Sequence, residues 1–444
     1  MKTRTFFFLV LALLLVSFVA KFPQGLGSSP PIHGFGPIHG DGEGYYAYLP
    51  AVFLRGDLLT IEPNEYESGR DFLAHPAFIR WSETNRYLNK YSPGVAVLVT
   101  PFFGLAVLVS FVLGQPLDGY NLIFQFFSGM AVLILVASGA ALLYRAYRRF
   151  FGQTVAALTV LGLLLATNLW HYTVFDSLYS HAFAFFATSL VVSLTIKWYQ
   201  NPGNLPVSLL LGVSFGLSFL IRNANVWVGF FFLGYGLVAK REVANRLRLV
   251  FRRWQSFFLI GLGTVATIIP QLVYHRAVTG RLLVYSYPGV GFTWFDPAWY
   301  GVFLSPRRGL LFWVPLFWLG VVGLVGCFKK RPIWIWAVIP ALAVQAYLIA
   351  SWSQWWFGDG LGHRAFIDGY PLWGFLVAAG VTQARRFSQR GAYLFLVACI
   401  LFNLMVTGWY WGGVLPRDHV TWSRLLQLLT FEGPRLSWLP PLVN

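Results

Sequence analysis

Long apolar runs alternate with short polar loops along most of this chain. Most runs approach the roughly 20 residues that an α-helix needs to cross a hydrocarbon core. They are continuous, whereas a strand of a membrane barrel would alternate apolar and polar positions. The pattern therefore predicts an all-α polytopic membrane protein. The runs are Phe6–Ala20, Val95–Leu113, Leu122–Leu143, Val155–Leu169, Ala182–Ile196, Val207–Ile221, Val226–Ala239, Phe257–Val273, Leu310–Cys327, Ile333–Ala350, Ile367–Val381 and Ala392–Trp411.

The composition agrees with this class, because 57% of the 444 residues are hydrophobic and only 11% are charged. The first run has two readings, since Lys2 and Arg4 precede it as they would in a secretory signal peptide. Phe18 does not suit a cleavage site after Ala20, so a retained first helix is favoured over a cleaved one. Cys327 and Cys399 lie in or beside apolar runs and indicate neither a disulfide framework nor a zinc site.

The net charge of +17 is concentrated in short loops between the runs, which argues against a nucleic-acid partner. The positive-inside rule places these loops in the cytoplasm. They contain 18 of the 33 basic residues but only Glu242 among the acids. The basic residues assigned to this side are Lys2, Arg4, Arg145, Arg148, Arg149, Lys197, Lys240, Arg241, Arg246, Arg248, Arg252, Arg253, Lys329, Lys330, Arg331, Arg385, Arg386 and Arg390.

This orientation limits the number of crossings. A cytoplasmic N-terminus and a cytoplasmic Arg145 require an even number of spans between them. Residues 94–113 are therefore expected not to cross, and Pro101 and Gly104 should interrupt that helix. Eleven crossings remain. The expected organisation is one membrane domain over residues 1–412, with a large first external loop at 21–93 and an external C-terminal tail at 413–444.

Candidate chemistry gathers in the predicted external loops. The stretch HGDGEGYYAYLP follows the first run and holds Asp41 and Glu43, and ionisable groups beside a bilayer are functional candidates by default. If this segment is extended, His39, Asp41 and Glu43 lie on one side and are candidate ligands for a divalent metal ion. Later in the same loop, the aromatic and basic stretch at 71–94 suits helices lying in the headgroup layer.

Several basic and aromatic residues are candidates for substrate binding, because a guanidinium grips phosphate through its planar fork. Snorkelling toward the interface and, for Asp176, capping of a helix near Ser180 are the structural alternatives. No nucleotide-binding loop, zinc-protease motif or nucleophile elbow occurs in the sequence. The substrate-binding candidates are Arg364, Arg222, Arg307, Arg308, Lys90, Tyr91 and His363.

The order of these parts resembles the GT-C superfamily of integral-membrane glycosyltransferases, which use polyprenyl-phosphate sugars. The nearest branches are the protein mannosyltransferases, the aminoarabinose transferases and the bacterial RgtA/B/C/D-like group. The resemblance covers roughly residues 6–411 and rests on DGEGYYAYLP, NKYSPGVAVLVTPFF, DSLYSHA, IRNAN and WWFGDGLGHRAFIDGYP. Ala224 departs from the pattern usual in the IRNAN turn, so Arg222 carries over better than its neighbours.

The resemblance implies a GT-C-type bundle of about 11 transmembrane helices. It also implies an inverting transfer from a polyprenyl-phosphate sugar to a hydroxyl of a lipid, glycan or protein acceptor, as in cell-envelope glycan biosynthesis. Asp41 would be the base and Asp176 a second acid. Gly42 separates Asp41 from Glu43, so the choice between these two stays open. No cofactor beyond a divalent metal ion is indicated.

Two other functions compete with this prediction. A transporter or flippase of lipid-linked sugars would usually show internal repeats and charged segments near the bilayer midplane, whereas the ionisable groups here gather at one face. A ligase for pyrophosphate-linked glycans would need more external arginines around a large loop. The expected location is a bacterial inner or plasma membrane, with the active site on the periplasmic face.

Overall fold

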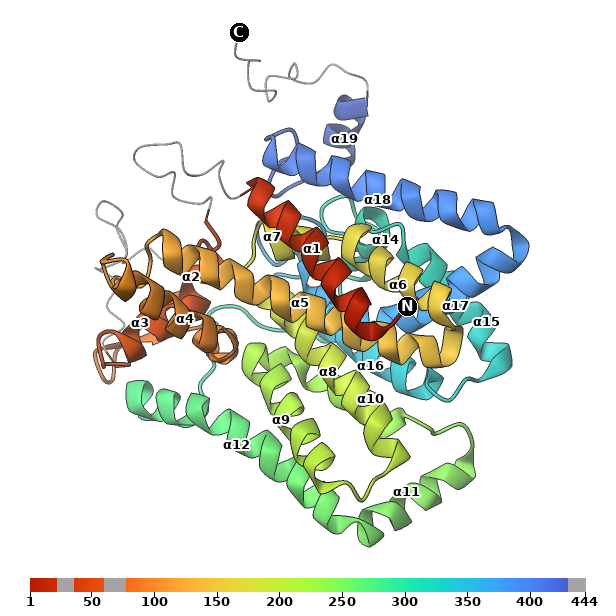
Figure 1. The fold of residues 1–444 in the computed structure, drawn as a ribbon, viewed down its shortest axis with the longest axis horizontal. Coiled ribbons are helices and arrows are strands. Elements are labelled where there is room, and N and C mark those ends of the chain that lie inside the picture. The colour runs from red at the N-terminus through yellow and green to blue at the C-terminus, as the bar shows by residue number, and fades with distance from the viewer. Residues whose placement is uncertain (22–35, 60–76, 430–444) are drawn as a thin grey trace. The chain divides into compact units, whose positions relative to one another are not determined.

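The computed structural model describes residues 1–21, 36–59 and 77–429, and this part of the chain is mostly helical (Figure 1). Seven helical segments in it are long and apolar enough to cross a membrane. Three shorter apolar helices accompany them: α6 (Gln153–Leu165), α9 (Leu205–Ile221) and α16 (Ile335–Ser351). The polytopic helical class is thus confirmed, and the count of eleven crossings stays a prediction. The seven segments are α1 (Thr3–Lys21), α4 (Gly94–Val112), α5 (Leu122–Phe151), α8 (Ser180–Gln200), α12 (Trp254–Thr279), Arg364–Phe387, which joins η5 to α17, and α18 (Gln389–Trp411).

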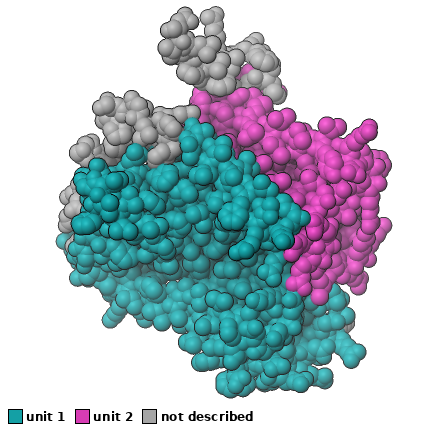
Figure 2. Space-filling view, viewed as in Figure 1, with its two compact units in different colours: residues 1–146, 172–289 teal, residues 147–171, 290–444 magenta. Residues whose placement is uncertain are grey.

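The helices form two compact units, coloured separately in Figure 2. Unit 1 comprises residues 1–146 and 172–289, and unit 2 comprises residues 147–171 and 290–444. The chain passes between them within α5, within α7 (Leu169–Val174) and after Gly289. The two units do not test whether residues 1–412 form the single domain expected from the sequence, so that domain stays a prediction.

The first helix of unit 1 buries one stripe of side chains. Phe6, Val10, Leu14 and Phe18 are fully buried and lie four residues apart, so they share one face of α1. Phe6 stacks on Tyr144 of α5 with ring centroids 4.4 Å apart. Apolar side chains on the remaining surface of α1 are exposed, as a helix facing hydrocarbon requires.

The predicted first loop differs from expectation in two places. The extended conformation that would place His39, Asp41 and Glu43 on one side is absent, because Asp41 begins helix α2 (Asp41–Tyr46), which is followed by α3 (Tyr48–Phe53). The interfacial helix expected over 71–94 is wrong where the structure describes it, because β1 (Phe78–Trp81) and β2 (Arg86–Asn89) form an antiparallel hairpin. Aromatic residues in both strands favour a sheet, and Asn85 supplies the positive φ of 57° that the turn needs. Residues 22–35 and 60–76 of the expected loop 21–93 lie outside the described residues.

Helix α4 corrects a third expectation. It runs unbroken through Pro101, although the sequence suggested an interruption there. Membrane helices tolerate proline where other groups satisfy the freed backbone atoms. One argument for a non-crossing helix at 94–113 is therefore lost, and whether it crosses stays a prediction. Other runs do break: Leu310–Cys327 divides at Pro315 into α14 (Leu310–Trp313) and α15 (Phe317–Lys330).

Close helix pairs depend on glycine. A Cβ at Gly216 of α9 would lie 2.6 Å from the carbonyl oxygen of Thr264 in α12, and one at Gly212 would overlap the carbonyl of Ile260. The small-xxx-small spacing lets the two backbones approach, as is common between membrane helices. The rest of this half of unit 1 consists of η4 (Asn223–Val228), α10 (Gly229–Gly234) and α11 (Lys240–Arg252).

Unit 2 is built around α17 (Tyr370–Phe387), most of which is buried. Helix α15 packs closely on it, because Gly323 and Gly380 leave room for the backbone of the opposite helix. The expected tail at 413–444 contains a short helix at Trp422–Leu429, and residues 430–444 of it lie outside the described part. The remaining elements of unit 2 are α13 (Trp299–Phe303), η5 (Arg364–Gly369) and α19 (Trp422–Leu429).

Candidate active site

Asp41 is the first residue of α2 and is partly buried. Its Oδ1 accepts a hydrogen bond of 2.7 Å from the hydroxyl of Tyr91. Burial and then the charge of Asp41 raise the pKa of Tyr91 well above its usual value, so Tyr91 stays protonated and donates. The structure thus joins two residues that the sequence singled out separately.

Three glycines let α2 pack closely against neighbouring side chains. Gly40 has a φ of 55°, which favours glycine, and a Cβ there would overlap the hydroxyl of Tyr179. A Cβ at Gly42 would lie 2.9 Å from the Cβ of Leu178, and one at Gly44 would overlap the ring of Tyr91. The glycines of GDGEG therefore allow α2 to pack tightly on protein, and that tight packing fixes the position of Asp41.

Asp176 is buried and binds His39, which stands two residues before Asp41. The distance between His39 Nε2 and Asp176 Oδ1 is 2.9 Å, and His39 Nδ1 lies 2.5 Å from the carbonyl oxygen of Gly36. Helix α8 begins after Tyr179, which occupies the N-cap position, so Asp176 is not the N-cap residue of this helix. Asp176 holds the segment that leads into α2.

The predicted metal ligands do not converge. Helix α2 turns by about 100° per residue, so Asp41 and Glu43 point in directions about 160° apart. The three residues were candidate ligands on the condition that the segment is extended, and helix α2 does not meet that condition. Among the described residues, no group of three or more His, Cys, Asp or Glu side chains could hold a metal ion. His39, Asp41 and Glu43 therefore do not fit a metal site.

The loop before α4 is held rigidly beside Asp41. Asn89 donates from Nδ2 to the carbonyl of Gly44 at 2.7 Å, and its Oδ1 accepts from the backbone N–H of Tyr91. The carbonyl of Tyr91 accepts from Tyr48 at 2.5 Å. The Lys90 ammonium lies 5.0 Å from the ring centroid of Tyr91 and 5.7 Å from that of Tyr287, within cation–π range. Lys90 thus adds a positive charge beside the Asp41–Tyr91 pair.

Arg222 supplies a second cation in unit 1. It follows the last residue of α9, and its Nη1 lies 3.0 Å from Nε2 of His181. Burial raises the pKa of Tyr45 in α2 above its usual value. The charge of Arg222 lowers this pKa and the charge of Asp41 raises it, so both charges act on the same phenol. The turn is fixed to the loop of Lys90, because Ser92 donates to Asn223 at 2.9 Å. Arg222, Lys90 and Asp41 therefore belong to one cluster.

In unit 2, the tandem arginines are engaged with protein. Arg307 forms a two-pronged pair with Asp418, with Nε–Oδ1 at 2.9 Å and Nη2–Oδ2 at 2.7 Å. Arg308 is buried and donates to the carbonyls of Gly358 and Arg417, each at 2.7 Å. These contacts connect three loops, so both arginines have a structural role. Their predicted role in substrate binding remains a prediction.

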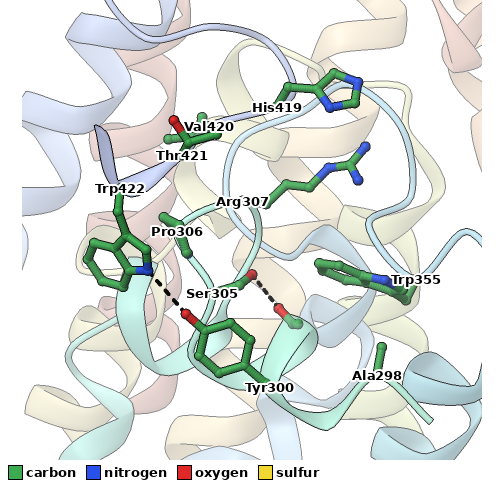
Figure 3. Close-up of a pocket in the computed structure, with 11 residues that line it drawn as sticks. Ala298, Tyr300, Ser305, Pro306, Arg307, Trp355, His419, Val420, Thr421 and Trp422 are labelled. Atoms are coloured by element: carbon green, nitrogen blue, oxygen red, sulfur yellow. Dashed lines mark hydrogen bonds between the residues drawn. The ribbon is translucent and has the colours of Figure 1, made fainter. Parts of the chain in front are cut away.

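A pocket of about 460 Å³ lies beside Arg307 (Figure 3). Trp355 and Trp422 contribute indole walls, and the Trp422 indole N–H donates to the hydroxyl of Tyr300 at 3.1 Å. The surface that lines this pocket is mostly apolar. Arg307 places a guanidinium at this pocket, with its fork turned toward Asp418.

The two candidates His363 and Arg364 lie in different surroundings. His363 is fully buried, and its ring packs between Phe357 and Phe366 with centroids 5.9 Å and 4.9 Å away. Arg364 is the first residue of η5 and is partly buried. His363 thus lies in an aromatic cluster, and a contact of either residue with substrate remains a prediction.

Sequence reasoning missed several residues of these clusters. His181 lies in the quoted DSLYSHA stretch, close to Asp176 in the sequence, and this position could have marked it as a candidate. Tyr45 was also inside a quoted motif. Asp418 carried no signal, because its partner Arg307 stands more than a hundred residues earlier in the chain.

No protein-family model matches the chain, and no curated protein is similar to it. Solved structures do match. ArnT from Cupriavidus metallidurans in the apo state is 15% identical over 76% of this chain and 54% of its own, with a TM-score of 0.47. The Archaeoglobus fulgidus oligosaccharyltransferase, in complex with Zn and sulfate, is 12% identical over 90% of this chain and 52% of its own, with a TM-score of 0.51.

Both of these proteins are GT-C membrane glycosyltransferases. At such low identity the likeness to the oligosaccharyltransferase shows the fold alone, and that fold is GT-C-like. The expected structural relationship is therefore confirmed. The chain spans about half the length of the two solved structures.

Proposed function

We propose that this protein is a membrane glycosyltransferase that moves a sugar from a polyprenyl-phosphate donor to a hydroxyl acceptor, with inversion at the anomeric carbon. The single observation that carries the proposal is the Asp41 carboxylate, held by Tyr91 and accompanied by Lys90 and Arg222. It is a carboxylate in a fixed position among cations, within a GT-C-like fold.

Asp41 acts as the base in this proposal. The acceptor oxygen attacks the anomeric carbon while its proton passes to a carboxylate oxygen of Asp41. Tyr91 holds the other carboxylate oxygen in place and cannot serve as the base, because it stays protonated. Glu43 points away from Asp41 on α2, which favours Asp41 in this role. Asp176 acts as a positioning residue through His39.

The bond between the anomeric carbon and the phosphate oxygen breaks in the same step, and the polyprenyl phosphate leaves as an anion. This leaving group needs positive charge more than a proton. Arg222 and Lys90 are the cations that accompany Asp41 in unit 1, and we assign the phosphate to them. Arg364 remains a further candidate.

We keep the eleven-crossing topology as part of the proposal, with the shorter helices α6, α9 and α16 and the interrupted segments completing the spans. The basic loops then face the cytoplasm and Asp41 faces the opposite side, in a bacterial inner or plasma membrane. The acceptor is a lipid, glycan or protein that presents a hydroxyl on that side.

The deciding experiment uses purified protein in vesicles, supplied with radiolabelled polyprenyl-phosphate sugars and membrane lipids. We expect the label to move from the donor to an acceptor with the wild-type protein, and not with the Asp41→Asn variant. Movement of the intact labelled lipid across the bilayer without transfer would identify a transporter and overturn the proposal.

A further inference from the structure

Helix α11 connects α10 to the membrane helix α12 (Figure 1). It has two chemically different faces. Val243, Leu247 and Phe251 lie four residues apart and share one face. Their side chains are 52%, 61% and 80% exposed. Trp254, at the start of α12, is also exposed. A row of large apolar side chains on the protein surface marks a site for a partner or a membrane.

The neighbouring face of α11 is basic. Arg241, Arg248 and Arg252 are spaced by seven and four residues, so they project from one side of the helix and are exposed. Within the part of the chain that the structure describes, no acidic side chain pairs with these three guanidinium groups. Glu242, the acid of this helix, accepts the backbone N–H of Ala239 at 2.6 Å. These positive charges are therefore uncompensated by the helix itself.

The orientation of α11 on unit 1 is fixed by Arg246. This residue donates to the carbonyl of Tyr235 at 2.6 Å, and its guanidinium lies 4.2 Å from the ring centroid of Tyr199. Burial lowers its pKa to about 10, so it remains charged at neutral pH. The apolar and basic faces are thus presented in a set direction.

We propose that α11 lies in the headgroup layer of the bilayer and binds anionic phospholipid headgroups. Val243, Leu247 and Phe251 enter the acyl boundary, and Arg241, Arg248 and Arg252 contact lipid phosphates. Two facts favour a bilayer over a protein partner. Helix α12 starts two residues after α11 ends, so α11 emerges at a membrane surface. A strongly basic, amphipathic helix of this kind is attracted to anionic lipid. This site is independent of the proposed glycosyl transfer.

The test uses the full chain with Cys327→Ala and Cys399→Ala, and with Ala244→Cys on the exposed surface of α11 labelled by an environment-sensitive fluorophore. The protein is reconstituted in vesicles that mix phosphatidylcholine with phosphatidylglycerol. In one preparation the phosphatidylglycerol carries brominated chains, and in the other the phosphatidylcholine does. The ratio of quenching, corrected for lipid composition, gives the local preference for the anionic lipid.

We expect the wild-type helix to prefer phosphatidylglycerol, by about five-fold for each arginine that contacts a phosphate. Arg241→Gln, Arg248→Gln and Arg252→Gln together should return the ratio to about one, while quenching itself persists through the apolar face. The matched control, Lys329→Gln with Lys330→Gln and Arg331→Gln, removes the same charge at the end of α15 and should keep the preference.

Two outcomes overturn the proposal. Equal quenching by both lipids in the wild-type protein would show that the arginines select no anionic headgroup. Absence of quenching by either lipid would place α11 away from the bilayer and would favour a protein partner.

Discussion

At the scale of single residues, the hydrogen bond from Tyr91 to Asp41 supports the proposal that Asp41, rather than Glu43, is the base. It fixes Oδ1 of Asp41, and the helical turn directs Glu43 elsewhere. The sequence left these two acids undecided, because it could not reveal that the glycine-rich stretch is helical. Three substitutions test the residues that matter most in the two units.

Asp41→Asn should lower the rate of sugar transfer by about a thousand-fold, because general-base catalysis contributes two to four powers of ten. The measurement is transfer of radiolabel under single-turnover conditions, with donor binding measured separately and expected to persist. Glu83→Gln is a matched control in the same predicted loop, since Glu83 is an exposed acid of the hairpin. Unchanged turnover in Asp41→Asn would remove the base assignment.

Tyr91→Phe should reduce kcat by about ten-fold, the effect of losing one hydrogen bond to a charged group, and should leave KM for the donor nearly unchanged. Tyr46→Phe makes the same chemical change at a buried tyrosine that donates to the carbonyl of Gly119, away from Asp41. We expect Tyr46→Phe to keep kcat. Equal losses in both variants would indicate a general packing effect.

The Arg307–Asp418 pair gives a prediction about pH. Burial raises the pKa of Asp418, but the hydrogen bond from Arg307, a backbone N–H and the charges of both arginines outweigh it, so the pKa lies below its usual value. The pair therefore stabilises unit 2 above a pH of about 4, and the contribution is lost as the pH falls through the lowered pKa.

Asp418→Asn should accordingly cost about 2 kcal/mol at neutral pH and lower Tm, with the difference from wild type shrinking in acid. Thermal unfolding in detergent across pH measures this difference. Asp296→Asn, at an exposed acid of the same unit, should have little effect. A constant difference at all pH values would contradict the assignment.

At the scale of elements, the apolar pattern predicted well where helices form. It predicted poorly where a helix is interrupted. Long runs such as Phe6–Ala20 became single helices, because length and hydropathy suffice there. Pro101 was tolerated inside α4, whereas Pro315 separates two helices, and sequence alone does not distinguish these contexts. The hairpin of β1 and β2 was missed because short aromatic segments suit either a strand or an interfacial helix.

The contact between α9 and α12 can be tested through Gly212. Gly212→Ala should destabilise the protein by about 1 to 3 kcal/mol, because the new Cβ overlaps the backbone of Ile260. Gly261→Ala on α12 meets open space and should be neutral or slightly stabilising, since alanine favours a helix. Thermal unfolding of both variants gives the comparison. Equal Tm values would show that the close contact at Gly212 does not contribute to the stability of the protein.

At the scale of the whole molecule, the class of fold was predictable because each membrane span is a run of consecutive apolar residues. The candidate site was predictable only in part. Motif order singled out Asp41, Tyr91 and Arg222, but contacts such as His39 with Asp176 join residues 137 positions apart. Pairing of this kind depends on tertiary packing that no local pattern encodes.

The predicted topology can be tested with two cysteines in a background without Cys327 and Cys399. Ser82→Cys lies in the turn of the hairpin, and Asn245→Cys lies on the exposed surface of α11. A membrane-impermeant maleimide added to intact cells should label position 82 and should label position 245 only after permeabilisation. Labelling of both positions from the same side would overturn the orientation and the proposed reaction with it.

The overlap that a Cβ at Gly44 would make with Tyr91 has an evolutionary consequence. Any descendant of this sequence that acquires a side chain at position 44 must shrink or move the aromatic group at position 91. These two positions should therefore vary together, and a lineage that changes one without the other should lose the acid's partner.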